Sequence, residues 1–174
     1  MDDRLIVFVG GIHGVGKGTI CKALAEEFDF LHLSASQVLK WNEINDAKNK
    51  KVKNFATTQE RLITNLNLII EPNKKYLLDG HFTLLNSDGE PEKIDESTFD
   101  GIQPKSIILL TCEPEIIYKR LKQRDNSIYK LSILEKMQKM EIERANYISE
   151  RLNIPLFTVI DGETSSVFEH IAKL

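Results

Sequence analysis

The chain has 174 residues, of which 26 are acidic and 23 are Lys or Arg, giving a formal net charge of −3. Its composition, 41% hydrophobic and 28% charged, is that of a globular protein and excludes a fibrous or largely disordered one. The negative charge argues against general nucleic-acid binding, and no apolar run approaches the ~20 residues that cross a membrane.

This length predicts one domain over residues 1–174, which we expect to be a monomer or a weak oligomer. The segment after Met1 lacks the layout of a signal peptide, so a cytoplasmic location is expected. In such a compartment Cys21 and Cys112 are expected to be buried thiols rather than a disulfide.

Short, continuously apolar runs recur along the chain. In chain order they cover residues 5–9, 30–33, 76–78, 106–110 and 154–160. Continuous apolarity over so few residues is typical of strands that are covered on both faces, as in a parallel sheet. Each run is therefore interpreted as one buried strand.

Longer segments with helical spacing of apolar residues separate these strands. They cover residues 19–28, 57–70, 114–124, 131–152 and 167–174. The alternation predicts a three-layer α/β fold, with a five-stranded parallel sheet flanked by helices. Residues 82–101 interrupt the pattern, and the turn signal at 86–89 predicts a hairpin or small excursion there.

A glycine-rich segment follows the first strand and opens the first helix. It reads Gly11-Ile12-His13-Gly14-Val15-Gly16-Lys17-Gly18-Thr19. Its glycines let the backbone aim N–H groups at phosphate oxygens, the helix N-terminus adds positive potential, and Lys17 reaches the outer phosphates. This is the glycine and lysine spacing of a P-loop, so the whole segment is predicted to bind ATP or a related nucleotide.

The loop departs from the usual P-loop pattern after its lysine, and it contains a histidine. Gly18 stands where Ser or Thr usually follows the lysine, which leaves Thr19 as the predicted hydroxyl ligand of an accompanying Mg²⁺. His13 is expected to contribute its backbone to the loop rather than its imidazole.

The sequence Gly16-Lys17-Gly18-Thr19 resembles the same part of the P-loop in adenylate kinases. Further segments along the chain are similar to that family, and they occur in the same order. Residues 31–40 resemble the family's acceptor segment, with Ser34 on its serine and Lys40 at the place of a phosphate-binding arginine. Residues 58–61 resemble the acceptor-side helix of the archaeal type, which implies a substrate contact for Arg61. The resemblance thus implies an acceptor-binding region at about 34–70.

The third strand ends at Leu77-Leu78-Asp79-Gly80-His81. This segment lacks the Pro-Arg of most adenylate kinases and is similar to the archaeal-type enzymes and to small nuclear adenylate-kinase-like proteins. Asp79 faces the P-loop, where its carboxylate can bind Mg²⁺ directly or orient a magnesium-bound water. His81 either orients that water, contacts the acceptor or caps local structure.

Three arginines complete the candidate site. Arg120 and Arg124 lie four residues apart on one helix face, near the carboxyl ends of the strands. The resemblance implies that they border a short lid at about 124–130 and that Arg120 also touches the nucleotide. Arg144 lies on an apolar stripe, and the family has a phosphate-binding arginine in this helix. The alternatives are a solvated basic face for the pair, and a snorkelling side chain or a pair with Glu141 for Arg144.

The resemblance implies a P-loop kinase that transfers a phosphoryl group from ATP to a nucleoside monophosphate, with AMP as the expected acceptor. Its catalytic residues are predicted to be Lys17, Asp79, Arg120, Arg124 and Arg144. Two alternatives remain: a kinase of another small acceptor, such as a nucleoside or sugar acid, and an ATPase or nucleotide-switched protein that binds a partner. The missing arginine after Gly80 and the lysine at position 40 favour the first alternative.

Overall fold

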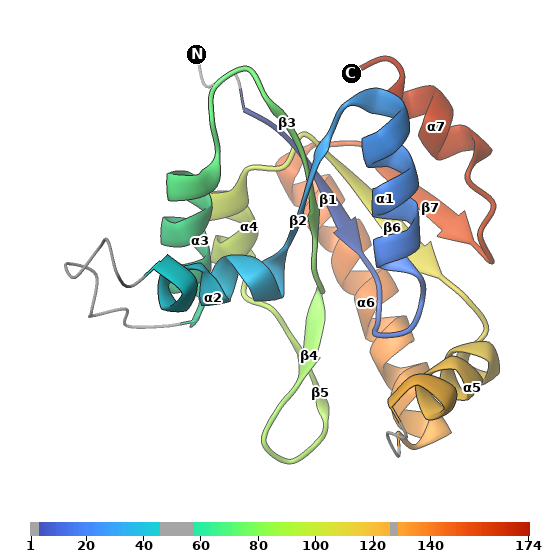
Figure 1. The fold of residues 1–174 in the computed structure, drawn as a ribbon. Helices are drawn as coiled ribbons and strands as arrows, with labels where there is room; N and C mark the ends of the chain where they lie inside the picture. Colours follow the sequence, from blue (N-terminus) through green and yellow to red (C-terminus); the bar gives the residue numbers. More distant parts are fainter. Residues whose placement is uncertain (1–3, 46–57, 126–128) are drawn as a thin grey trace.

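The computed structural model describes residues 4–45, 58–125 and 129–174 (Figure 1). Its strands are β1 (Leu5–Gly10), β2 (Leu31–Ser34), β3 (Lys75–Asp79), β4 (Thr83–Leu85), β5 (Pro91–Lys93), β6 (Ser106–Thr111) and β7 (Leu156–Ile160). Its helices are α1 (Lys17–Phe28), α2 (Ala35–Asn45), α3 (Thr58–Ile69), α4 (Glu96–Ile102), α5 (Pro114–Asp125), α6 (Leu131–Leu152) and α7 (Ser165–Ile171). The middle of the predicted lid, 126–128, and part of the predicted acceptor region, 46–57, lie outside the described residues.

Within the described residues, five strands form one sheet in the order β2-β3-β1-β6-β7, and every neighbouring pair is parallel. The predicted α/β fold with a five-stranded parallel sheet is therefore confirmed. In this register Val9 of β1 lies beside Asp79 of β3, and Ser34 of β2 lies beside Asp79 on its other side. Because the strands are parallel, their carboxyl ends share one edge, and the loop after β1 lies at that edge (Figure 1).

Each face of the sheet is covered by helices, which explains the continuously apolar strands. On β1, Val7 and Val9 pack into a core with side chains of α1, α5 and α7. Ile6 and Phe8 point to the opposite face and pack with side chains of α2, α3 and α4. Successive residues of a strand alternate between faces, so a strand buried on both sides must be apolar at every position.

Helix α6 takes part in both cores. Its first half contributes Leu134 and Met137 to the core that contains α1, and its second half contributes Ala145 and Ile148 to the other. Glu141 lies between these pairs and is 1% exposed. The helix therefore crosses from one layer to the other beside the carboxyl edge of the sheet.

The predicted hairpin is present, and a helix follows it. Strands β4 and β5 pair antiparallel, and the Asn86 side chain accepts hydrogen bonds from the backbone N–H groups of Asp88 and Glu90, both at 3.0 Å. The prediction was incomplete for the end of residues 82–101, because 96–102 form α4. Asp95 caps this helix by accepting a hydrogen bond from the N–H of Ser97.

Helix α2 was also absent from the sequence prediction. Among its residues up to position 40, Val38 is the buried one, so the segment offers little of the apolar periodicity that identifies a helix. Its position is fixed instead by α3, where the buried Asn65 side chain donates to the carbonyl of Val38 at 2.7 Å. Over the described residues, none of the helices is both long and apolar enough to cross a membrane.

Candidate functional site

The glycine-rich segment forms a tight loop between β1 and α1. Gly16 precedes the helix with a φ of 112°, a left-handed conformation that side chains other than glycine rarely adopt. Gly14 has a φ of 80° and lies against α5, where an added Cβ would come within 2.9 Å of Leu121. The loop can therefore keep this shape, and its contact with α5, only with glycine at these two positions.

The N-terminus of α1 opens onto this loop. The first turn of α1 contains no acidic residue, and no side chain caps it. Backbone N–H groups at such a terminus lack helical partners and carry partial positive charge, which favours an anion there. The local structure is therefore suited to an anion such as phosphate, and the phosphate site remains a prediction.

Lys17 is 9% exposed at the first position of α1. Its Nζ donates hydrogen bonds to the carbonyl oxygens of Gly11 at 2.7 Å and Ile12 at 3.2 Å. Burial lowers the pKa of Lys17 to about 8, while the carboxylates of Glu141 and Asp79 oppose that shift. The ammonium group is therefore partly desolvated, a state in which a phosphate would be a strong partner.

Glu141 connects this loop to other parts of the chain. Its Oε1 accepts hydrogen bonds from the backbone N–H groups of Gly11 and Phe82, both at 2.9 Å, and its Oε2 accepts one from the Thr83 hydroxyl at 2.7 Å. Burial raises the pKa of Glu141, and these hydrogen bonds act in the opposite direction. One carboxylate thus fixes the start of the loop against the hairpin and α6.

A cavity of about 800 Å³ lies over the loop. Its lining includes His13, Gly14, Val15, Gly16, Lys17, Gly18 and Thr19 from the loop, Asp79 from β3, Arg120 and Arg124 from α5, and Asp161, Gly162, Thr164 and Phe168 from the β7–α7 side. Arg120 also donates to the carbonyl oxygens of Gly14 and Val15, both at 3.4 Å. The structure therefore brings the predicted loop residues together with Asp79, Arg120 and Arg124.

Asp79 has a partner that sequence reasoning missed. His32 Nε2 lies 2.5 Å from Asp79 Oδ2, and the two side chains are 30% and 16% exposed. His32 lies on β2, the neighbour of β3, and the sequence analysis gave it no role. The buried thiol of Cys21 completes this group from α1. Burial, with a contribution from Asp79, raises the pKa of Cys21 to about 12.

His81 lies against the loop rather than in solvent. Its ring centroid is 4.3 Å from that of His13. Burial, together with the positive charges of Lys17 and His13, lowers the pKa of His81 to about 2, so the imidazole is neutral. Its Nδ1 is buried and has no hydrogen-bond partner among the described residues.

The predicted acceptor residues lie on neighbouring elements beyond the lining of the cavity. Ser34 ends β2, where its hydroxyl is 2.9 Å from that of Ser36. Lys40 is exposed on α2, and Arg61 is half-buried on α3, which packs against α2. The buried Nε of Arg61 has no hydrogen-bond partner among the described residues. These three residues remain a predicted acceptor site.

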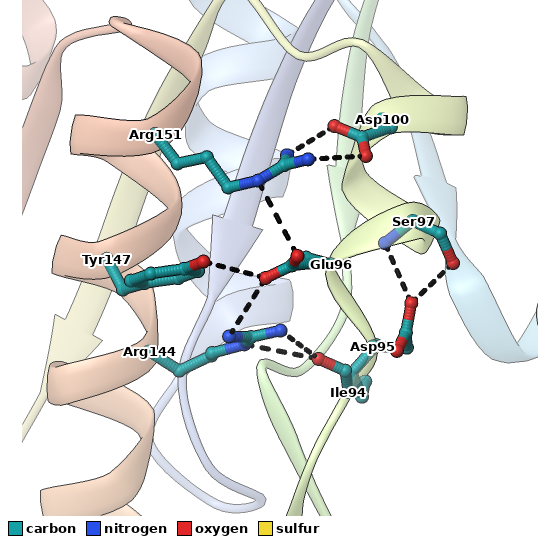
Figure 2. Close-up of polar contacts among 8 residues, drawn as sticks. All are labelled: Ile94, Asp95, Glu96, Ser97, Asp100, Arg144, Tyr147 and Arg151. Carbon is teal, nitrogen blue, oxygen red and sulfur yellow. Dashed lines mark hydrogen bonds and ion pairs between the residues drawn. The ribbon is translucent and has the colours of Figure 1, made fainter.

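Arg144 takes a different position from the one predicted. Its Nε and Nη2 donate to the carbonyl oxygen of Ile94 at 3.1 and 2.8 Å, and its Nη1 lies 3.9 Å from Glu96 (Figure 2). The guanidinium also lies over the ring of Tyr147. Arg144 therefore points toward the segment before α4, and it is not among the residues that line the described cavity.

Because Arg120 and Arg144 lie in different surroundings, replacing each with alanine should have different effects. We expect Arg120→Ala to weaken ATP binding, because this side chain lines the cavity, and to leave thermal stability nearly unchanged, because it is exposed. We expect Arg144→Ala to lower the free energy of unfolding by about 1–3 kcal/mol and to leave ATP affinity unchanged, because the Ile94 carbonyl loses a charged donor. Denaturant unfolding and isothermal titration with ATP test the pair, and a large loss of ATP affinity in Arg144→Ala would contradict this placement.

Neither Glu141 nor His32 was assigned to the site from the sequence. Glu141 was considered only as a partner of Arg144, although a glutamate between Met137 and Ile148 on an apolar helical stripe is itself a signal of a buried acceptor. Its actual partners are Gly11, Phe82 and Thr83, which are at least 58 residues away in the sequence.

Comparisons with known proteins agree with this geometry. Residues 10–138 match the model of a family described as AAA domain. The chain is 30% identical over 133 residues to the uridylate kinase of Saccharomyces cerevisiae, an alignment that covers 71% of this chain and 63% of the relative. It is 28% identical over 118 residues to a putative adenylate kinase of Methanocaldococcus jannaschii, which covers 68% of this chain and 58% of the relative. The predicted resemblance to adenylate kinase-like proteins is thereby confirmed.

The chain spans about three fifths of the length of these two relatives. Among solved structures, a gluconokinase from Sinorhizobium meliloti 1021 superposes with a TM-score of 0.54 at 12% identity, covering 98% of this chain and 90% of that one. At this identity the likeness concerns the fold, and it agrees with the five-stranded parallel sheet.

Proposed function

This chain belongs to the AAA domain family, and it is similar to nucleotide kinases. We propose that it is a P-loop kinase that transfers the terminal phosphoryl group of ATP to a nucleoside monophosphate. The observation that carries the proposal is the shared cavity. The glycine loop, Lys17, Asp79, Arg120 and Arg124 all line it. Phosphoryl transfer depends mainly on positioning and on positive charge around the transferred group, and this set of residues supplies both.

The cavity volume of about 800 Å³ supports a nucleoside triphosphate as the ligand, because small-molecule sites are of this size. In the proposed complex the triphosphate lies along the loop, where the α1 N-terminus and the Lys17 ammonium balance its charge. Arg120 and Arg124 approach it from α5, and the β7–α7 side supplies the wall for the base. We propose that Lys17, with the two arginines, stabilises the charge that develops on the transferred group.

Oxygen ligands suitable for Mg²⁺ line the same cavity. Thr19 offers a hydroxyl and Asp79 a carboxylate, and hard oxygen donors are the ligands that Mg²⁺ prefers in proteins. Asp79 Oδ2 is 2.5 Å from His32 Nε2, which holds the carboxylate in one orientation. When bound, Mg²⁺ supplies positive charge to the phosphate oxygens. We propose Thr19 and Asp79 as its ligands, with Asp79 acting directly or through water.

The acceptor is proposed to be AMP, bound on the β2–α2–α3 side by Ser34, Lys40 and Arg61. The Asp79-Gly80-His81 segment, which resembles the archaeal-type adenylate kinases, supports AMP. The buried Nδ1 of His81, close to the loop, suits a hydrogen bond to the acceptor or to a water beside it.

A transfer assay with a panel of acceptors tests the proposal. Purified protein with ATP and Mg²⁺ is given AMP, CMP, UMP, GMP, a nucleoside and gluconate in separate reactions. Loss of the acceptor, formation of its phosphorylated product and release of inorganic phosphate are measured. We expect a diphosphate product with AMP. A diphosphate product only with another monophosphate would show that the acceptor base is not adenine, and product with gluconate or the nucleoside would select the other kinase class. Release of inorganic phosphate without loss of any acceptor would indicate an ATPase.

Lys40 provides a test of the acceptor side. We expect Lys40→Ala to raise the KM for the acceptor about 10–100-fold and to leave the KM for ATP within a factor of two, because a cation that meets only the acceptor phosphate contributes roughly 1.5–3 kcal/mol. Steady-state kinetics with each substrate varied in turn measure both constants.

Lys105→Ala is the matched control for Lys40. Lys105 is also exposed, but it precedes β6 at the amino edge of the sheet, so neither KM should change. If Lys40→Ala changes both constants equally, or only that of ATP, the proposed acceptor site is wrong.

A further inference from the structure

Three potential metal ligands from three different elements lie close together, near Lys17 of the phosphate loop. They are the thiol of Cys21 on α1, the imidazole of His32 on β2 and the carboxylate of Asp79 on β3. One ligand atom from each lies within 4.8 Å of the other two, and His32 Nε2 is 2.5 Å from Asp79 Oδ2. The proposed transfer reaction uses Asp79 as a metal ligand and His32 to orient it, and it leaves Cys21 without a role.

The chemistry of these ligands favours a softer ion than Mg²⁺. A thiolate, an imidazole nitrogen and a carboxylate oxygen are the ligand types that bind Zn²⁺, whereas Mg²⁺ selects oxygen. A Cys21 thiolate and the Asp79 carboxylate would together balance the two positive charges of the ion. Three protein ligands leave one position of a tetrahedral site for water or another small ligand.

The geometry requires only small movements of side chains. Around one tetrahedral Zn²⁺, nitrogen, oxygen and sulfur ligand atoms are separated by ~3.3–3.6 Å. His32 and Asp79 must therefore move apart by ~1 Å. The Cys21 sulfur lies within 4.8 Å of both ligand atoms, so it must approach them by at most ~1.5 Å. The His32 and Asp79 side chains are 30% and 16% exposed, which gives an ion a path from solvent, while Cys21 is fully buried behind them.

From this convergence we infer that Cys21, His32 and Asp79 form a binding site for Zn²⁺ or a similarly soft divalent cation. Binding replaces the hydrogen bond between His32 and Asp79 with two metal–ligand bonds. The ring proton of His32 must then reside on Nδ1, which frees Nε2 for the ion, and the Cys21 thiol releases its proton to solvent. The Lys17 ammonium lies close enough to interact electrostatically with Cys21 and Asp79, so it sets a limit on the affinity for any cation here.

The site gives soft metals a specific effect on the proposed function. Asp79 cannot serve the magnesium-bound phosphates while it is a ligand of Zn²⁺, so occupation of the site would inhibit transfer at saturating Mg²⁺ and ATP. This consequence rests on the proposed kinase activity, whereas binding of the ion does not. The two can therefore be tested separately.

Binding is measured first, with nucleotide-free protein and with free Zn²⁺ set by a metal buffer. We expect one Zn²⁺ per chain in the wild type, and Cys21→Ser and His32→Gln should each weaken the affinity ~10–100-fold or more, because loss of a ligand costs at least as much as loss of a residue that supports one. Titration with Co²⁺ adds a spectroscopic readout, since a thiolate–cobalt absorption band should appear in the wild type and be lost in Cys21→Ser.

Cys112→Ser is the matched control, because Cys112 is the second buried thiol of the chain. It should keep both the Zn²⁺ affinity and the cobalt–thiolate band. Circular dichroism and thermal melting verify that each variant is folded, and Cys21→Ala replaces Cys21→Ser if the buried hydroxyl destabilises the core. Absence of Zn²⁺ binding in the wild type, or affinity unchanged by both Cys21→Ser and His32→Gln, would overturn the inference.

The activity measurement follows the binding measurement. Transfer by the wild type should fall as free Zn²⁺ rises through the measured dissociation constant, and the concentration needed should increase in Cys21→Ser by the same factor as the loss of affinity. If no transfer occurs with any acceptor, the proposed function fails while the metal site stands. If Zn²⁺ binds at Cys21 and transfer is unaffected, the proposal that Zn²⁺ and the magnesium-bound phosphates compete for Asp79 is wrong.

Discussion

Replacing Lys17 with methionine is expected to abolish phosphoryl transfer and, in the same protein, to raise its melting temperature in the absence of nucleotide. The loss of activity follows from removing the ammonium group that the cavity offers to the transferred phosphoryl, and it should reach at least ~10²–10³-fold in kcat. The gain in stability follows from burial, because Lys17 is 9% exposed and its pKa is lowered to about 8.

The sign of the stability effect can be worked out from that pKa. A lysine whose pKa is lower in the folded state than in the unfolded one binds fewer protons when folded, so its charge destabilises the fold at neutral pH. This penalty is fully present below pH 8 and decreases as the pH rises toward the ordinary lysine value. Methionine has a similar length and no charge, so we expect a gain of about 1–3 kcal/mol at pH 7 after the lost hydrogen bonds to Gly11 and Ile12 are counted.

Thermal unfolding and transfer assays measure the two effects, and Lys22→Met is the matched control. Lys22 lies on the same helix, but its side chain is 77% exposed and its partner is Glu26 at i+4, so neither activity nor stability should change by much. Adding ATP should stabilise the wild type and the control, but not Lys17→Met. Near-normal turnover in folded Lys17→Met would contradict the assignment of the loop.

The second large effect is expected at Glu141. Removing its carboxylate with alanine leaves the N–H groups of Gly11 and Phe82 and the Thr83 hydroxyl without their acceptor. Each buried hydrogen-bonding group left without a partner costs about 1–3 kcal/mol, so Glu141→Ala, which affects three such groups, should unfold at a much lower denaturant concentration. Glu141→Gln keeps an acceptor oxygen for both N–H groups and should lose less stability.

The pH dependence of kcat/KM shows whether Glu141 acts on Lys17 or only stabilises the fold. Among the charged groups that raise the pKa of Lys17, Glu141 has the largest influence. In the wild type, kcat/KM for ATP should fall as the pH rises through about 8, because Lys17 loses its proton in the free enzyme. In Glu141→Gln that decline should begin at lower pH. Glu143→Gln, an exposed neighbour on α6, should leave it in place, and an unchanged profile in Glu141→Gln would show a structural role only.

The sheet and the phosphate loop could be predicted from the sequence because their signals are local. A strand buried on both faces is apolar at successive positions, as at residues 106–110, and the loop carries its glycines and lysine within nine residues. Helix α4 could have been found from Asp95 as a cap and the spacing of Phe99 and Ile102. Because α4 was not predicted, the carbonyl of Ile94, which precedes this helix, was not recognised as the partner of Arg144.

The remaining parts of the site depend on contacts between distant segments. His32 meets Asp79 because β2 and β3 are neighbours, although 47 residues separate the two in the chain. Glu141 meets Gly11 across 130 residues. The apolar stripe around Glu141 signals a buried carboxylate but does not identify its partners, and the sequence near His32 does not indicate Asp79. Only the folded arrangement shows which of these polar groups are paired.

Helix α6 couples the unfolding of the two layers of the protein. Its two halves are embedded in the cores on opposite faces of the sheet, with the Glu141 network between them. Neither layer can therefore open independently without fraying the helix or breaking a buried carboxylate contact. Amide hydrogen exchange along the centre of α6 should thus proceed only through global opening, and the two faces should behave as one cooperative unit.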